Sequence, residues 1–271
     1  MSLKIWVVAV AASLFVQASF AQEKKTSTAL LVIGSSYSEG KTPFNNGVAP
    51  LGGLSVGFGS YLSLGHALTR EKKLNGFLIN EAQAGATTFA RPACPPGAAT
   101  CGPAGWDSLQ TQLERALARV ALPPTFAQYN AKYVVITAVN DCLHSDAFGI
   151  PQGMTTPCTP QQLNQVVDRL IALGSLALAK GVTPIYDVYP RYQDLDFNLF
   201  QSLFGFSWVI NEHDYGLLRS LAKTRIPAEL PGAVVLDMWK DFVHLGDGIH
   251  PNPATAENAA RLIAKKLQEL N

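Results

Sequence analysis

The chain alternates short β-branched apolar runs with longer segments of helical periodicity, and few folds accommodate such an order. The apolar runs are Ala29–Ile33, Phe77–Asn80, Tyr133–Thr137, Val182–Val188 and Ala233–Asp237. Continuous apolar runs of this length are typical of strands buried on both faces. The helical patterns are Tyr61–Thr69, Trp106–Ala121, Pro160–Lys180, Asn211–Glu229 and Pro253–Leu270. The order predicts an α/β protein, with a mostly parallel five-stranded sheet between two layers of helices.

The N-terminus has the three regions of a secretory signal peptide. Lys4 precedes an apolar run over residues 5–16, and the small-residue site Ser19-Phe20-Ala21 follows. The apolar run is shorter than the ~20 residues that a transmembrane helix needs, although an uncleaved anchor is the alternative. We therefore expect a signal peptide over 1–21 and a single domain over 22–271. After cleavage near Ala21 this domain would be periplasmic or secreted, without a transmembrane segment.

The composition excludes several classes of partner. Of the 271 residues, 21 are Lys or Arg and 20 are Asp or Glu, which leaves a net charge of +1, and 48% are hydrophobic. Nucleic-acid binders are usually far more basic, and disordered chains are less apolar. The Gly-rich segment 52–57 lacks the lysine of a phosphate-binding loop. We expect a monomer that binds no nucleic acid and needs no cofactor.

Export makes disulfides the expected state of the four cysteines, Cys94, Cys101, Cys142 and Cys158. Four cysteines allow three connectivities, and the spacing does not select one of them. Sequential pairing is our preference, because each pair would then bracket a loop rich in proline and glycine. Zinc is a weak alternative, since the spacing lacks the close cysteine pair of a zinc knuckle, and we expect no metal.

Residues able to perform chemistry follow four of the five predicted strands. In a parallel sheet, sites lie beyond the carboxyl ends of the strands. Ser36 follows the first strand, Gly85 the second and Asn140 the third. Asp247 and His250 follow the fifth strand in a turn rich in glycine, three residues apart, which allows a carboxylate to contact an imidazole.

Each of these residues also has a purely structural interpretation. A serine or asparagine can cap a turn, a glycine can supply a positive φ angle, and a lone histidine can lie on the surface. A metal site made of His244, Asp247 and His250 would lack a fourth ligand. Taken together, however, the residues supply the nucleophile, the base, the orienting carboxylate and the oxyanion donors of acyl transfer.

From Gly34 to His250 the sequence resembles the SGNH (GDSL-type) hydrolase family. The family's first block, G-D-S-x-S, reads Gly34-Ser35-Ser36-Tyr37-Ser38, and the third block, G-x-N-D, reads Ala138-Val139-Asn140-Asp141. The fifth block, D-x-x-H, is complete as Asp247 and His250, and the glycine of the second block looks like Gly85. Two positions depart from the pattern: Ser35 replaces an aspartate and Ala138 replaces a glycine. Neither change removes a group that performs chemistry.

The resemblance implies a flavodoxin-like three-layer α/β/α sandwich and a serine hydrolase that acts on carboxylic ester bonds. It implies a triad of Ser36, Asp247 and His250. It also implies an oxyanion hole formed by the N–H groups of Ser36 and Gly85 and the Asn140 side chain.

The substrate class is predicted from an aromatic run over 197–208, which follows the fourth predicted strand. This run is either a helix that faces the core or an apolar wall for an acyl chain. We expect a fatty-acyl ester, as for a lipase or lysophospholipase. The alternatives are a carbohydrate O-acetyl esterase that uses the same site, and a non-catalytic exported binding protein that retains the fold.

Overall fold

The fold was analysed in a computed structural model, which describes residues 27–39, 47–50, 63–90, 107–121, 129–137, 140–143, 156–205 and 208–271. The predicted signal peptide lies outside the described residues, as do Cys94, Cys101 and Ala138. Within the described ranges, no helix is both long enough and apolar enough to cross a bilayer.

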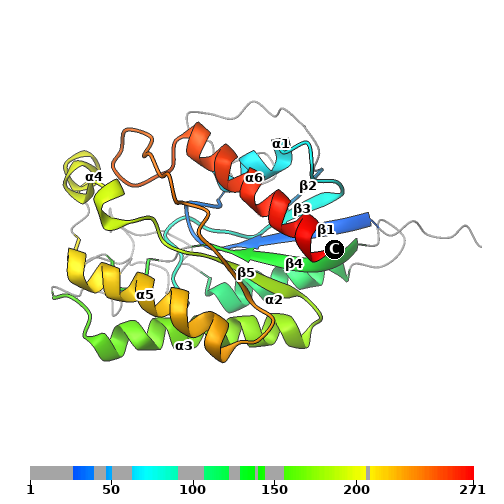
Figure 1. The fold of residues 1–271 in the computed structure, drawn as a ribbon, viewed down its shortest axis with the longest axis horizontal. Helices are drawn as coiled ribbons and strands as arrows, with labels where there is room; N and C mark the ends of the chain where they lie inside the picture. The colour runs from blue at the N-terminus through cyan, green and yellow to red at the C-terminus, as the bar shows by residue number, and fades with distance from the viewer. Residues whose placement is uncertain are drawn as a thin grey trace, which may run out of the picture.

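A six-stranded sheet in the order β2-β3-β1-β4-β5-β6 forms the middle layer (Figure 1). The strands are β1 (Ser27–Ile33), β2 (Gly47–Pro50), β3 (Phe77–Asn80), β4 (Tyr129–Ile136), β5 (Thr183–Asp187) and β6 (Val234–Leu236). All neighbours pair in parallel except β2, which is antiparallel to β3. The five predicted strands are confirmed. The sequence did not reveal β2, because its glycine and proline disfavour strands, and a strand with proline is tolerated mainly at an edge.

Helices cover both faces of the sheet, which confirms the predicted three layers (Figure 1). One face carries α1 (Leu64–Arg70) and α6 (Pro253–Leu270), and the other carries α2 (Leu109–Val120), α3 (Pro160–Ala179) and α5 (Glu212–Glu229). A short 3₁₀ helix, η1 (Tyr192–Asp194), and α4 (Phe197–Phe204) follow β5.

Polar caps set the starts of the long helices. The hydroxyl of Ser108 accepts the Thr111 N–H at 3.1 Å, so α2 begins three residues later than the periodicity predicts. Thr159 caps α3 through a capping box, and Asn252 caps α6. In both of these helices a proline occupies the first turn, where a missing N–H is harmless.

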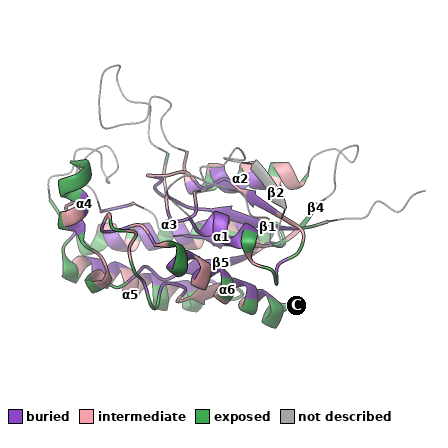
Figure 2. Cartoon of the chain, turned by 90° about the horizontal axis from the view of Figure 1, so that it is seen from above, coloured by how far each residue is buried: buried purple, intermediate pink, exposed green. Residues whose placement is uncertain are grey.

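The core lies where the central strands meet the helices, and it is drawn in purple in Figure 2. Leu31, Val32 and Ile33 of β1 have no exposed surface, as expected for a strand covered on both faces. The aromatic run after β5 is partly buried and partly exposed to solvent. Phe197 and Phe200 pack inward from α4, whereas Phe204 on the same helix is 54% exposed.

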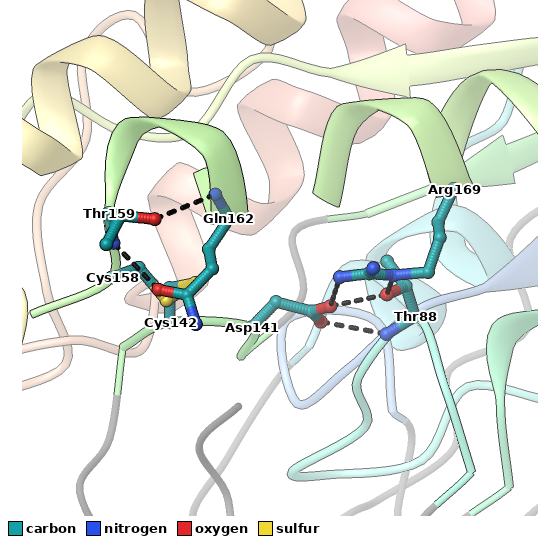
Figure 3. Close-up of a disulfide and its surroundings, with 7 residues drawn as sticks. All are labelled: Thr88, Asp141, Cys142, Cys158, Thr159, Gln162 and Arg169. Carbon is teal, nitrogen blue, oxygen red and sulfur yellow. Dashed lines mark hydrogen bonds and ion pairs between the residues drawn. A yellow bond between two sulfur atoms is a disulfide. The ribbon is translucent and has the colours of Figure 1, made fainter. Parts of the chain in front are cut away.

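A disulfide joins Cys142 to Cys158, with 5.6 Å between the Cα atoms (Figure 3). This confirms the sequential pairing for the second pair of cysteines. The bond fastens the turn after β4 to the residue just before the Thr159 cap of α3.

We expect the Cys142→Ser/Cys158→Ser double variant to lose about 3 kcal/mol of unfolding free energy, because the unfolded chain would regain the entropy of an open loop. A urea titration at neutral pH without reductant measures the loss, and the unchanged chain serves as the control. Equal urea midpoints for the two proteins would contradict the prediction.

Candidate active site

The turn that follows β1 carries Ser36 and is built around Gly34. Gly34 has a φ of +138°, and a Cβ added there would lie 2.1 Å from Thr137 Oγ1, so only glycine fits. The side chain of Gln112, on α2, forms hydrogen bonds with both backbone polar groups of Gly34. Its Oε1 accepts the Gly34 N–H at 2.8 Å, and its Nε2 donates to the Gly34 carbonyl at 3.2 Å. The turn is therefore held by a strand on one side and a helix on the other.

Hydrogen bonds within the turn close it. The Ser35 carbonyl accepts the N–H groups of Ser38 and Glu39, both at 3.0 Å. The Ser38 hydroxyl lies 2.7 Å from the Thr137 hydroxyl, at the end of β4. Ser35 is thus a buried residue of a closed turn at the position where the family pattern has aspartate. Ser36 itself is half-buried.

The glycine turn after β3 lies against the Ser36 turn. The Gln83 N–H donates to the Gly34 carbonyl at 3.1 Å, and the Ala86 N–H donates back to the Gln83 carbonyl at 3.0 Å. Gly85 lies inside this turn with a φ of +78°, a left-handed conformation that favours glycine.

Asn140, after β4, is bound to the same glycine turn. Its backbone N–H and its side-chain Nδ2 both donate to the Ala86 carbonyl at 3.1 Å. A side-chain amide carries two N–H groups, so the bond to Ala86 also orients the second one. The structure therefore brings Asn140 next to Gly85, as the predicted site requires.

Asp247 and His250 form a carboxylate–imidazole pair after β6. Asp247 Oδ2 lies 2.6 Å from His250 Nδ1, and Asp247 Oδ1 accepts the backbone N–H groups of Ile249 and His250 at 3.0 and 2.9 Å. The nearby His244 accepts the N–H groups of Gly246 and Gly248 through Nδ1, so it shapes the turn.

The start of α4 fixes this turn in space. Gly248 has a φ of +97°, and a Cβ there would lie 2.1 Å from the Asp196 carbonyl oxygen. The Asp196 N–H donates to the Gly248 carbonyl at 2.8 Å. The His250 ring lies near two aromatic rings, with centroids at 5.8 Å for Phe200 and 6.3 Å for Tyr37, the residue after Ser36. The imidazole therefore approaches the Ser36 turn.

Ser36 and Asn140 line one small cavity. Its volume of about 30 Å³, counted over the positions that the centre of a water molecule can take, leaves room for two to three water molecules, since one water needs roughly 10–15 Å³. The other lining residues are Ser35, Tyr37, Leu143, Tyr189, Leu195, Phe197, Trp208, Tyr215 and Ile249. The wall is thus mainly aromatic and aliphatic, and it includes the residue that precedes His250.

Burial by itself would raise the pKa of Asp247, but its bonds with His250 and with backbone N–H groups outweigh burial. The charge of His250 acts in the same direction, and the net effect lowers the pKa of Asp247. A carboxylate that stays ionised and binds Nδ1 leaves Nε2 of the imidazole as the nitrogen able to accept a proton.

The sequence did not point to Gln112 as a residue of this site. A signal was present, because Gln112 is a polar residue on the apolar stripe of α2 between Leu109 and Leu113, and all three are buried. A polar side chain in that position needs a partner inside the protein. The sequence does not show that the partner is Gly34.

No protein-family model matches the sequence, and no curated protein matches it. Solved structures do match. A carbohydrate acetylesterase from Sinorhizobium meliloti is 17% identical, with a TM-score of 0.55 over 90% of this chain and 100% of that one. The aryl esterase of M. smegmatis is 14% identical, with a TM-score of 0.54 over 90% and 100%. A GDSL-like lipase from Bacteroides thetaiotaomicron is 10% identical, with a TM-score of 0.52 over 90% and 89%. The chain has the α/β fold of these proteins, as the sequence resemblance implies.

The lowered pKa of Asp247 makes stability depend on pH. A depressed carboxylate pKa contributes stability above the unfolded-chain pKa of about 3.9, and this contribution is lost as the pH falls through the folded pKa. We expect Asp247→Asn to lower the free energy of unfolding at pH 6, and the deficit to shrink towards pH 3. Urea titrations across this range measure it.

The exposed Asp241, in the preceding loop, provides the matched control. Asp241→Asn should change the unfolding free energy little at any of these pH values. A deficit for Asp247→Asn that stays constant from pH 6 to pH 3 would contradict the prediction.

Proposed function

We propose that the chain is an exported serine esterase that hydrolyses carboxylic esters of short acyl groups. The observation that carries the proposal is the Asp247–His250 pair at 2.6 Å beside a cavity that Ser36 and Asn140 line. A nucleophile, a base with its orienting carboxylate, and amide donors are the parts that acyl transfer needs. The esterase fold of the matched structures agrees with this chemistry.

In the proposed reaction, Ser36 Oγ attacks the ester carbonyl while His250 Nε2 takes the hydroxyl proton. Asp247 holds the opposite ring nitrogen and stabilises the imidazolium that forms. The N–H groups of Ser36 and Gly85 and the Asn140 amide donate to the tetrahedral oxyanion. His250 then protonates the leaving alcohol, and a water activated by the same imidazole releases the acid from Ser36.

Export is part of the proposal. The N-terminal segment has the regions of a signal peptide, and the Cys142–Cys158 disulfide suits an oxidising compartment. We propose that the mature domain begins after Ala21 and acts in the periplasm or outside the cell. An ester of a small molecule is the partner that the site suits.

The size of the cavity favours a short acyl group over the fatty-acyl chain that the aromatic run predicts. Phe197 and Trp208 do line the cavity, but they lie 4.4 Å apart between ring centroids and leave only about 30 Å³. Room for two to three water molecules matches the three heavy atoms of an acetyl group. Two of the matched structures are a carbohydrate acetylesterase and an aryl esterase, which makes a sugar or aryl acetate the natural first substrate to test.

We expect Ser36→Ala to lower kcat/KM for p-nitrophenyl acetate by on the order of 10⁴-fold or more, because no nucleophile remains. Ser202→Ala, on the exposed side of α4, is the matched control and should stay within twofold of the unchanged chain. Mass spectrometry should find a fluorophosphonate adduct on Ser36. Absence of both hydrolysis and adduct would favour the non-catalytic binding protein.

We expect kcat/KM to fall at least tenfold from p-nitrophenyl acetate to p-nitrophenyl octanoate, because the longer chain does not fit the cavity. Phe197→Ala should move the preference towards longer acyl groups by enlarging the cavity. Leu203→Ala, at an exposed position of the same helix, should leave the preference unchanged. A preference for octanoate in the unchanged chain would support the fatty-acyl interpretation instead, and activity restricted to sugar acetates would favour the carbohydrate esterase.

A further inference from the structure

A polar cluster joins the Gly85 turn to the Asn140 turn, and two of its three residues are buried. Its members are Thr88, Asp141 and Arg169, and Figure 3 shows the three side chains directed towards one another. Thr88 lies three residues after Gly85, and Asp141 directly follows Asn140. Arg169 reaches the cluster from the middle of α3.

The carboxylate of Asp141 is the centre of the cluster and has no exposed surface. Its Oδ2 accepts the Thr88 backbone N–H at 2.8 Å, and its Oδ1 accepts the Thr88 hydroxyl. Arg169 donates through Nη2 to Asp141 Oδ1 at 3.4 Å and through Nε to Thr88 Oγ1 at 2.6 Å. The Thr88 hydroxyl therefore donates a hydrogen bond to Asp141 and accepts a hydrogen bond from Arg169.

The three residues depend on one another because a buried carboxylate is stable only with partners. Burial raises the pKa of Asp141, and the two bonds from Thr88 together with the charge of Arg169 oppose that increase. The Arg169 guanidinium lies over the Phe89 ring, 5.9 Å from its centroid, which restricts its position further. Removing one member leaves the others without full compensation.

The Asn140 turn is also held on its other side. Cys142, which has a φ of +66°, is bonded to Cys158 just before α3, and the Leu143 carbonyl accepts the Val209 N–H at 2.9 Å. Asn140 therefore belongs to a short turn tied to α3 both by a disulfide and by the Asp141–Arg169 pair (Figure 3). These contacts restrict the movement of the Asn140 turn, so its distance from the Gly85 turn is the main quantity that can still vary.

We propose that Thr88, Asp141 and Arg169 are positioning residues that set the separation between the Gly85 N–H and the Asn140 amide. The inference rests on the proposed function, in which these two groups donate to the oxyanion. Oxyanion donors stabilise a transition state only when they are aimed in advance, and a misplacement of about 1 Å can lower the rate on the order of 10²-fold. Thr88 links the two turns directly, whereas Arg169 acts through Thr88 and Asp141.

The test compares Thr88→Val, which removes the hydroxyl and keeps the shape, with Thr88→Ser, which keeps the hydroxyl. For p-nitrophenyl acetate we expect Thr88→Val to lower kcat about tenfold to hundredfold with KM within twofold. Thr88→Ser should restore kcat to within threefold of the unchanged chain. Rates are normalised to the fraction of folded protein that a fluorophosphonate labels at completion, so that misfolded molecules do not count.

Arg225→Met, on α5, is a control for the loss of a side-chain contact with α3 away from the two turns. Arg225 donates to Asp168, the neighbour of Arg169, at 2.7 Å, and it contacts neither of the two turns in the described structure. Its kcat should stay within twofold. The proposal is overturned if Thr88→Val keeps full kcat, if Thr88→Ser is as impaired as Thr88→Val, or if Arg225→Met shows the same loss.

Amide hydrogen exchange separates failure of this inference from failure of the proposed function. In Thr88→Val the amides of 84–90 and 140–143 should exchange at least tenfold faster than in Thr88→Ser, while those of α6 should not change. This readout needs no activity, so it still decides the coupling of the turns if the unchanged chain hydrolyses no ester. Equal exchange in the two variants would overturn the proposal.

Discussion

Three elements converge on the backbone of Gly34, and the arrangement of the site depends on this approach. Thr137 at the end of β4 comes so close that a Cβ would meet it at 2.1 Å, Gln112 of α2 pairs with both peptide groups, and the turn after β3 donates to the Gly34 carbonyl. A side chain at this position would clash with Thr137 at the end of β4. The Ser36 turn can therefore lie against the end of β4 because Gly34 has no side chain, and hydrogen bonds to the Gly34 backbone hold α2 and the Gly85 turn beside it.

The carboxylate–imidazole pair is built on a different principle. Asp247 holds His250 within one short turn by a side-chain bond and by two bonds to backbone N–H groups, so the pair is local in sequence. Only the position of the pair relative to the Ser36 turn depends on the tertiary structure. Gly248 packs against the Asp196 carbonyl, and Phe200 of α4 lies beside the imidazole, so the segment after β5 directs the pair towards the Ser36 turn.

The same segment shapes the cavity. Phe197 and Trp208 close its wall, while Leu203 and Phe204 of α4 face solvent. The aromatic run is therefore neither wholly a core helix nor wholly a wall. Phe197 and Phe200 are buried, whereas Phe204, on the same face one turn after Phe200, is exposed at the end of α4. Sequence composition shows that the run is apolar. The volume left between the rings follows from their packing, which the sequence does not show.

The sequence by itself determined the five parallel strands, the long helices and the local Asp247–His250 pair, since apolar periodicity and short-range spacing are written along the chain. It placed Ser36, Gly85 and Asn140 at strand ends, where a parallel sheet brings residues together. It did not reveal β2, the hydrogen bonds from Gln112 to the Gly34 backbone, or the Thr88–Asp141–Arg169 cluster. Those contacts join residues as many as 81 positions apart, and their partners are chosen by how the layers pack. Only the tertiary structure decided them, because a buried polar group shows its need for a partner but not the partner's identity.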